Sequence, residues 1–163
     1  MKRDLIKAFC AAGGLAVLMA IGTLNTSSAQ SAVGGGGRLE GTWDVQVSIN
    51  DCHGHVIRTF PSRLIYIAGG TFVESTSGIA PALKTPGFGV WSHTTGNTYA
   101  VTFKFFIFDT TNTFTGWQIV RAQLGLNQTA DSYTASGTVQ IYDVNGNLVG
   151  SGCVTTVGTR VEL

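Results

Sequence analysis

From residue 39 onward, apolar and polar residues alternate with the period of a β-strand. In residues 41–50, Trp43, Val45, Val47 and Ile49 share one parity, and Thr, Asp, Gln and Ser occupy the other. This is the pattern of a strand with one buried face. The same reading predicts strands over residues 41–50, 56–68, 71–75, 87–93, 98–108, 114–126, 133–144 and 148–161. No window shows a helical period longer than a turn or two.

The connections between these segments are mostly short and carry turn residues, such as Gly69-Gly70 and Asn145-Gly146-Asn147. Neighbouring strands joined in this way run antiparallel. A closed barrel would remove the exposed edges that an open sheet leaves. We therefore predict an all-β fold, an eight-stranded antiparallel up-and-down β-barrel. An open sandwich would need long crossover connections, which the sequence lacks.

The N-terminal region has the character of an export signal. Lys2, Arg3 and Lys7 precede an apolar run and then the small residues Ser28 and Ala29. We predict a secretory signal peptide over residues 1–29, a Gly-rich flexible tether over 30–38, and one barrel domain over 39–163. The product would be secreted or periplasmic. An uncleaved membrane anchor is the alternative.

Export changes how the cysteines are interpreted. Beyond the predicted leader the chain has two, Cys52 and Cys153, and an even pair in an oxidising compartment indicates a disulfide bond. Charge is nearly balanced, with ten Lys and Arg against nine Asp and Glu and no cluster of either sign. This composition argues against nucleic acid or an anionic membrane surface as a partner.

Two short motifs at the ends of the domain resemble the calycin signature of lipocalin-like barrels: Gly41-Thr42-Trp43 in the first strand and Thr159-Arg160 in the last. The resemblance implies that Trp43 plugs one end of the barrel and that Arg160 lies across it. With these two residues paired across the closing strands, Cys52 and Cys153 fall almost opposite each other. An outer-membrane barrel is the other interpretation of eight strands, but polar residues on the outward face of residues 41–50 count against stable membrane insertion.

The inward parity of the middle strands indicates the candidate site. Large side chains on one wall would face small ones such as Gly137 and Gly152 on another, leaving room for one small ligand. A packed core in which the aromatic rings fill that space is the alternative. The predicted ligand-binding residues are Trp91, His93, Tyr99, Phe103, Phe105 and Gln118.

We predict a lipocalin-like barrel that binds a small hydrophobic molecule, with His93 or Gln118 orienting it. One alternative is an enzyme, since such barrels also resemble small cyclases and isomerases, with His93 or Tyr99 as acid or base. Another is an interaction or inhibitor module. No catalytic triad, paired carboxylates or phosphate-binding loop can be placed, so no catalytic residue and no cofactor is predicted.

Two further groups of residues bear on metal binding and on association. Asp51, His53 and His55 share one loop, but two histidines separated by a single glycine are a weak metal signal, and no metal site is predicted. On the outward parity, Phe106, Phe108 and Trp117 would form an apolar strip on two neighbouring strands. Such a strip indicates a partner or self-association face.

Overall fold

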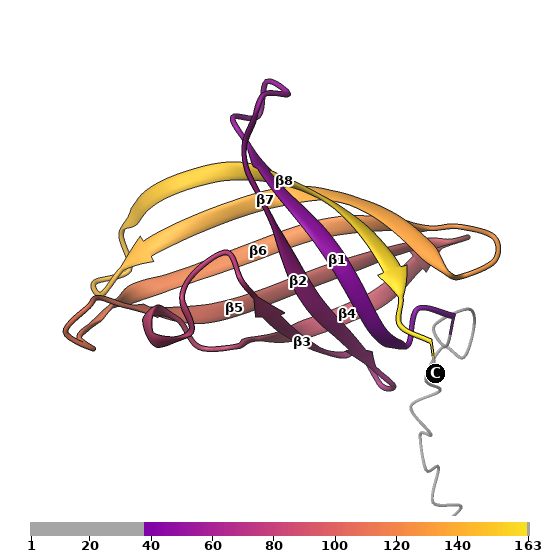
Figure 1. Ribbon diagram of the computed structural model, residues 1–163, viewed down its shortest axis with the longest axis horizontal. Helices are drawn as coiled ribbons and strands as arrows, with labels where there is room; N and C mark the ends of the chain where they lie inside the picture. Colours follow the sequence, from indigo (N-terminus) through magenta and orange to yellow (C-terminus); the bar gives the residue numbers. More distant parts are fainter. Residues whose placement is uncertain (1–37, 163) are drawn as a thin grey trace, which may run out of the picture.

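The chain forms a closed barrel of eight antiparallel strands in up-and-down order (Figure 1). This computed structural model describes residues 38–162. The predicted signal peptide and all of the tether except Arg38 lie outside the described residues. The strands are β1 (Gly41–Asn50), β2 (Val56–Ile67), β3 (Thr71–Thr76), β4 (Gly87–Thr95), β5 (Thr98–Phe108), β6 (Phe114–Leu126), β7 (Ser132–Asp143) and β8 (Leu148–Arg160). The predicted fold class is confirmed.

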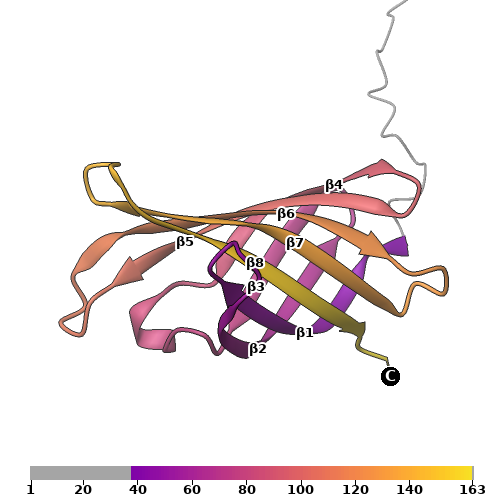
Figure 2. The same ribbon diagram turned by 90° about the horizontal axis from the view of Figure 1, so that it is seen from above.

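The barrel is closed by the first and last strands. Their ladder runs from the pair Trp43 and Arg160 to the pair Asn50 and Cys153, which is the register implied by the terminal motifs. In the view from above, β1, β2 and β3 cross beneath the wall that contains β6 and β7 (Figure 2). The interior is therefore bounded on all sides by strands, and no strand in residues 38–162 is left with an unpaired edge along its whole length.

Strand ends follow the turn residues, with small differences from the predicted limits. β4 continues to Thr95, two residues beyond its predicted end, because Gly96 makes the turn with a φ of 54°. β2 ends at Ile67 because Gly69 and Gly70 both have positive φ angles. Glycine adopts this left-handed backbone without the steric cost that a side chain brings.

The packed core fills one end of the barrel, which we call the closed end. Its fully buried side chains are Leu39, Trp43, Tyr66, Phe72, Tyr99 and Leu124. The indole N–H of Trp43 donates a hydrogen bond to the carbonyl of Leu39 at 2.9 Å, so the residues just before β1 also cover this end. The connections β1–β2, β3–β4, β5–β6 and β7–β8 lie at the opposite, open end.

Close pairing of β6 with β7 depends on Gly137. A Cβ at this position would lie 2.1 Å from the carbonyl oxygen of Arg121 and 2.7 Å from Cα of Ala122. Because backbone atoms cannot yield as a flexible side chain can, we expect Gly137→Ala to lower the free energy of unfolding by about 1–3 kcal/mol. Denaturant unfolding would measure the loss.

Gly125, on the neighbouring strand β6, provides the matched control. A Cβ there would have no atom within 4 Å, so Gly125→Ala should change stability little. Equal effects of the two substitutions would contradict the assignment of a steric role to Gly137.

Candidate functional site

A cavity of about 350 Å³ occupies the interior between the closed end and the open end. It extends from Tyr66 and Phe72, the core residues that form its floor, to Arg58 and Phe60 at the mouth. Most of its wall is apolar. The aliphatic and aromatic side chains of the middle section are Val47, Ile49, Phe103, Phe105, Val120, Val139, Ile141 and Val154. Of the two interpretations left open by the sequence, the barrel with an internal cavity is the one observed.

Small residues keep this space open. Ala122, Ala135 and Gly152 line the cavity on the consecutive strands β6, β7 and β8. A Cβ at Gly152 would have only one atom within 4 Å, the carbonyl oxygen of Asn50 at 3.8 Å. The space in front of Gly152 is therefore open.

The aromatic side chains of the wall contact one another through their rings. The ring of Phe103 lies 5.0 Å from that of Phe72 and 6.5 Å from that of Phe105, measured between centroids. Tilted and edge-on arrangements at these separations are favourable for aromatic pairs. The wall consequently presents a packed aromatic surface to the cavity.

The closed end holds the two residues of the terminal motifs. The guanidinium of Arg160 lies over the indole of Trp43, 4.4 Å from the ring centroid, and donates hydrogen bonds to the carbonyl oxygens of Ala130, Glu40 and Arg38. On the inner side, Tyr133 meets Trp43 edge-on at 4.9 Å. These contacts seal the barrel below the cavity.

Burial affects the tyrosines of this seal. Removal from water raises the pKa of Tyr66 well above its usual value, and the neighbouring Tyr133 adds to the shift. Burial also raises the pKa of Tyr133, so both hydroxyls stay neutral over the physiological range. Tyr66 contributes polarity but no charge to the floor of the cavity.

The predicted ligand-binding residues divide into two groups. Phe103, Phe105 and Gln118 line the cavity, and their register places Phe105 opposite Gln118 on the paired strands. Trp91 and Tyr99 lie in the packed core of the closed end. His93 lies beside Tyr99 in the β4–β5 hairpin, where its Nε2 hydrogen-bonds the carbonyl oxygen of Gly96 at 2.7 Å. These last three residues are outside the cavity lining.

The sequence reading missed a buried ion pair beside the cavity. Lys84 Nζ lies 2.7 Å from Oε2 of Glu74, and the two side chains are 4% and 6% exposed. Glu74 lines the cavity, whereas Lys84 comes from the β3–β4 connection and places its ammonium 4.3 Å above the ring centroid of Phe105. The connection also contains the short 3₁₀ helix η2 (Pro81–Leu83). One available signal was that Glu74 shares the inward parity of Phe72.

The mouth is held by hydrogen bonds between β2, β3 and the β3–β4 connection. Ser62 Oγ donates to Thr76 Oγ1 at 2.6 Å, and the same oxygen accepts from the backbone N–H of Gly78 at 3.1 Å. Gly78 packs so closely on Phe60 that a Cβ would lie 2.5 Å from its ring. The start of the connection is thus fastened over the rim of the cavity.

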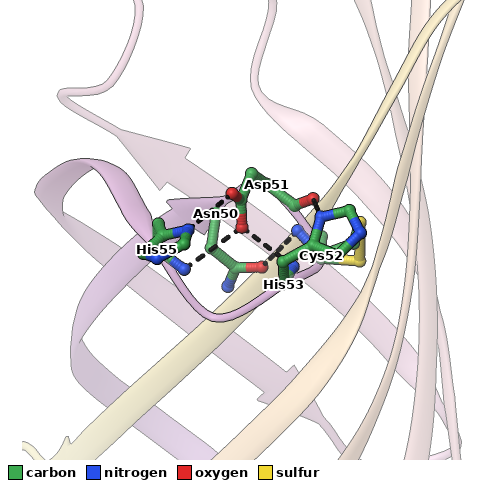
Figure 3. Close-up of a disulfide and its surroundings, with 6 residues drawn as sticks. Asn50, Asp51, Cys52, His53 and His55 are labelled. Atoms are coloured by element: carbon green, nitrogen blue, oxygen red, sulfur yellow. Dashed lines mark hydrogen bonds and ion pairs between the residues drawn. A yellow bond between two sulfur atoms is a disulfide. The ribbon is translucent and has the colours of Figure 1, made fainter.

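The disulfide lies at the open end (Figure 3). Cys52 and Cys153 are bonded, as predicted, across 101 residues of sequence. Beside it, Asp51 Oδ1 accepts hydrogen bonds from the backbone N–H groups of His53 and His55, and Oδ2 lies 2.9 Å from the imidazole Nδ1 of His55. These interactions, led by the one from the imidazole, lower the pKa of Asp51. These hydrogen bonds are all local, and they hold residues 51–55 in a turn.

The outward aromatic residues form a continuous group, which we call the outer aromatic face. Phe106 contacts Phe114 at 5.7 Å, and Trp117 stacks on Tyr142 at 5.8 Å. Lys104 Nζ lies 4.2 Å from the centroid of a Trp117 ring. Half of Phe106 remains exposed, at 46%. Self-association through this face stays a prediction.

No family model and no curated protein matches this sequence. Within residues 38–162, no helix has the length and apolar character needed to cross a membrane. The barrel geometry is consistent with a calycin-like fold.

Proposed function

We propose that this protein binds a small, mainly apolar molecule inside the barrel. The observation that carries the proposal is the cavity of about 350 Å³ with a predominantly apolar wall. Sites for small molecules are typically concave, apolar and supplied with a few polar groups. A guest packed against Phe103 and Phe105 would gain roughly 25 cal/mol for each Å² of apolar surface that it removes from water.

Export is part of this proposal. The export signal that the sequence predicts over residues 1–29 supports it. So does the disulfide, since such bonds persist mainly in oxidising compartments. A secreted or periplasmic carrier needs no energy source or cofactor, only a cavity that its ligand can reach from the open end.

A cavity-filling substitution tests the binding site. In Gly152→Leu the new side chain would extend into the cavity, because almost nothing lies near a Cβ at this position. We expect the fluorescent probe N-phenyl-1-naphthylamine to bind the unaltered protein with enhanced emission. Its affinity for Gly152→Leu should be at least tenfold lower, because the probe and the leucine would occupy the same volume.

Thr155→Leu is the matched control, since Thr155 is exposed and lies on the same strand. It should bind the probe as the unaltered protein does, and circular dichroism should show all three proteins folded. Failure of the unaltered protein to bind, or equal affinity for Gly152→Leu, would refute the interior site.

A further inference from the structure

Glu74 lines the cavity with a buried carboxylate, and the hydrogen bonds of this carboxylate fall on one of its two oxygens. Its Oε2 accepts a hydrogen bond from Lys84 Nζ at 2.7 Å and another from the backbone N–H of Gly87 at 3.1 Å. No described residue donates to the second oxygen, Oε1. Oε1 is also not a fully buried atom without a partner, since in residues 38–162 the Tyr133 hydroxyl alone is of that kind. Because Glu74 lines the cavity, we take the cavity as the space that Oε1 can reach.

Lys84 does not offer its charge to the cavity in the same way. Its ammonium is held between the Glu74 carboxylate and the face of Phe105, and it is not part of the cavity lining. The polar group that a ligand meets on this wall is therefore a hydrogen-bond acceptor, the Glu74 carboxylate. The ammonium of Lys84, which balances its charge, is not part of the lining. An acceptor in an apolar cavity favours a ligand group that donates a hydrogen bond.

The charges of Glu74 and Lys84 indicate that the ligand group that donates this hydrogen bond is neutral. An anionic ligand would meet the carboxylate oxygen directly and be repelled. A cationic ligand would lose its hydration shell to reach a carboxylate that Lys84 already neutralises, and such desolvation is costly. A hydroxyl loses far less when it leaves water.

Gln118 adds a second polar group on the far side of Phe105. It lies on β6 directly opposite Phe105 in the register and lines the cavity. No other described residue hydrogen-bonds its side chain. An amide can both donate and accept, and so it complements a hydroxyl better than it complements a charged group.

We propose that the ligand is an apolar alcohol or phenol whose hydroxyl donates a hydrogen bond to Oε1 of Glu74. This inference rests on the proposed function, since it names the chemical class that the interior site accepts. Recognition would come from the carboxylate, and most of the binding free energy from the apolar wall. A ligand of the same shape without the hydroxyl would still bind, but more weakly.

A set of naphthalenes of similar size tests the proposal by displacing N-phenyl-1-naphthylamine from the full protein at pH 7. The set is 2-naphthol, 2-methylnaphthalene, 2-naphthoate and 2-naphthylmethylamine. We expect 2-naphthol to bind at least tenfold more tightly than 2-methylnaphthalene, as for a hydrogen bond to a charged acceptor. The anion and the cation should bind more weakly than 2-naphthol.

A double substitution tests whether the preference for 2-naphthol over 2-methylnaphthalene depends on Glu74. In the double variant Glu74→Met, Lys84→Met the whole ion pair is replaced by apolar side chains of similar length, which buried pairs often tolerate. The preference for 2-naphthol should then vanish, while the affinity for 2-methylnaphthalene is kept. The control is Asp44→Met, Arg63→Met, which removes an exposed pair on the outside of the barrel and should retain the preference.

The other outcomes of these binding experiments would overturn different parts of the proposal. Equal binding of 2-naphthol and 2-methylnaphthalene, or tightest binding of the anion or the cation, would overturn hydroxyl recognition while leaving the interior site in place. A preference for 2-naphthol that survives in the Glu74→Met, Lys84→Met variant would overturn the assignment to Glu74. Failure of every naphthalene and of the probe to bind would overturn the proposed function itself.

Discussion

Removal of the Cys52–Cys153 disulfide is expected to lower the free energy of unfolding by about 4–5 kcal/mol. The bond spans 101 residues, so most of the folded domain lies within the loop that it closes. Without the bond, the unfolded chain gains the conformational freedom of that loop. The variant Cys52→Ser, Cys153→Ser should therefore unfold at a clearly lower denaturant concentration than the oxidised protein.

The barrel should nevertheless remain closed in this variant. The ladder between β1 and β8 from Trp43 to Asn50 is independent of the sulfur atoms, and the cavity lies on the inner face of these strands. Addition of dithiothreitol to the unaltered protein should reproduce the loss of stability. Ser151→Ala, a nearby change that keeps both cysteines, is the control. Identical unfolding of the oxidised and reduced proteins would contradict a stabilising role for the bond.

Lys84→Met is expected to be the second strongly destabilising change, at about 3–5 kcal/mol, because it leaves a carboxylate buried without its partner. Glu74 and Lys84 are 6% and 4% exposed, so the little water that reaches the carboxylate does not make up for the lost ammonium. The free energy of unfolding of the double variant Glu74→Met, Lys84→Met should lie much closer to that of the unaltered protein. Denaturant unfolding of the three proteins at pH 7 measures the difference.

The comparison of the single and double variants separates charge from packing. Both variants lose the same ammonium and its contact with Phe105, but only Lys84→Met leaves the carboxylate of Glu74 without its partner. A loss of stability that is equal in the single and double variants would show that loose packing of the connection is the cause.

The positions of the strands could be predicted because each strand is encoded locally. Alternation along residues 41–50 identifies the inward face of β1 whatever the rest of the chain does, and glycines such as Gly69 and Gly146 locate the turns. The terminal motifs supplied the one long-range relation, the pairing of Trp43 with Arg160. That single pair is enough to specify the closing register, and with it the approach of the two cysteines.

The composition of the site was predicted only in part. Parity along β4 and β5 identifies Trp91 and Tyr99 as inward, and both are buried. It does not identify the height at which the interior changes from packed core to open cavity. That height depends on how the rings of Trp43, Tyr66, Phe72 and Tyr133 fill the closed end together. Phe103 and Phe105 lie above it and line the cavity.

Residue order alone thus determined what depends on near neighbours and on the two ends of the domain: eight strands, their inward faces, the turns and the disulfide. The tertiary structure alone decided the shape of the space inside and the pairing of Glu74 with Lys84. Both depend on side chains that are distant in sequence and meet only when the barrel closes. A strand period specifies the face on which a residue lies, whereas volume and charge compensation are properties of the whole assembled interior.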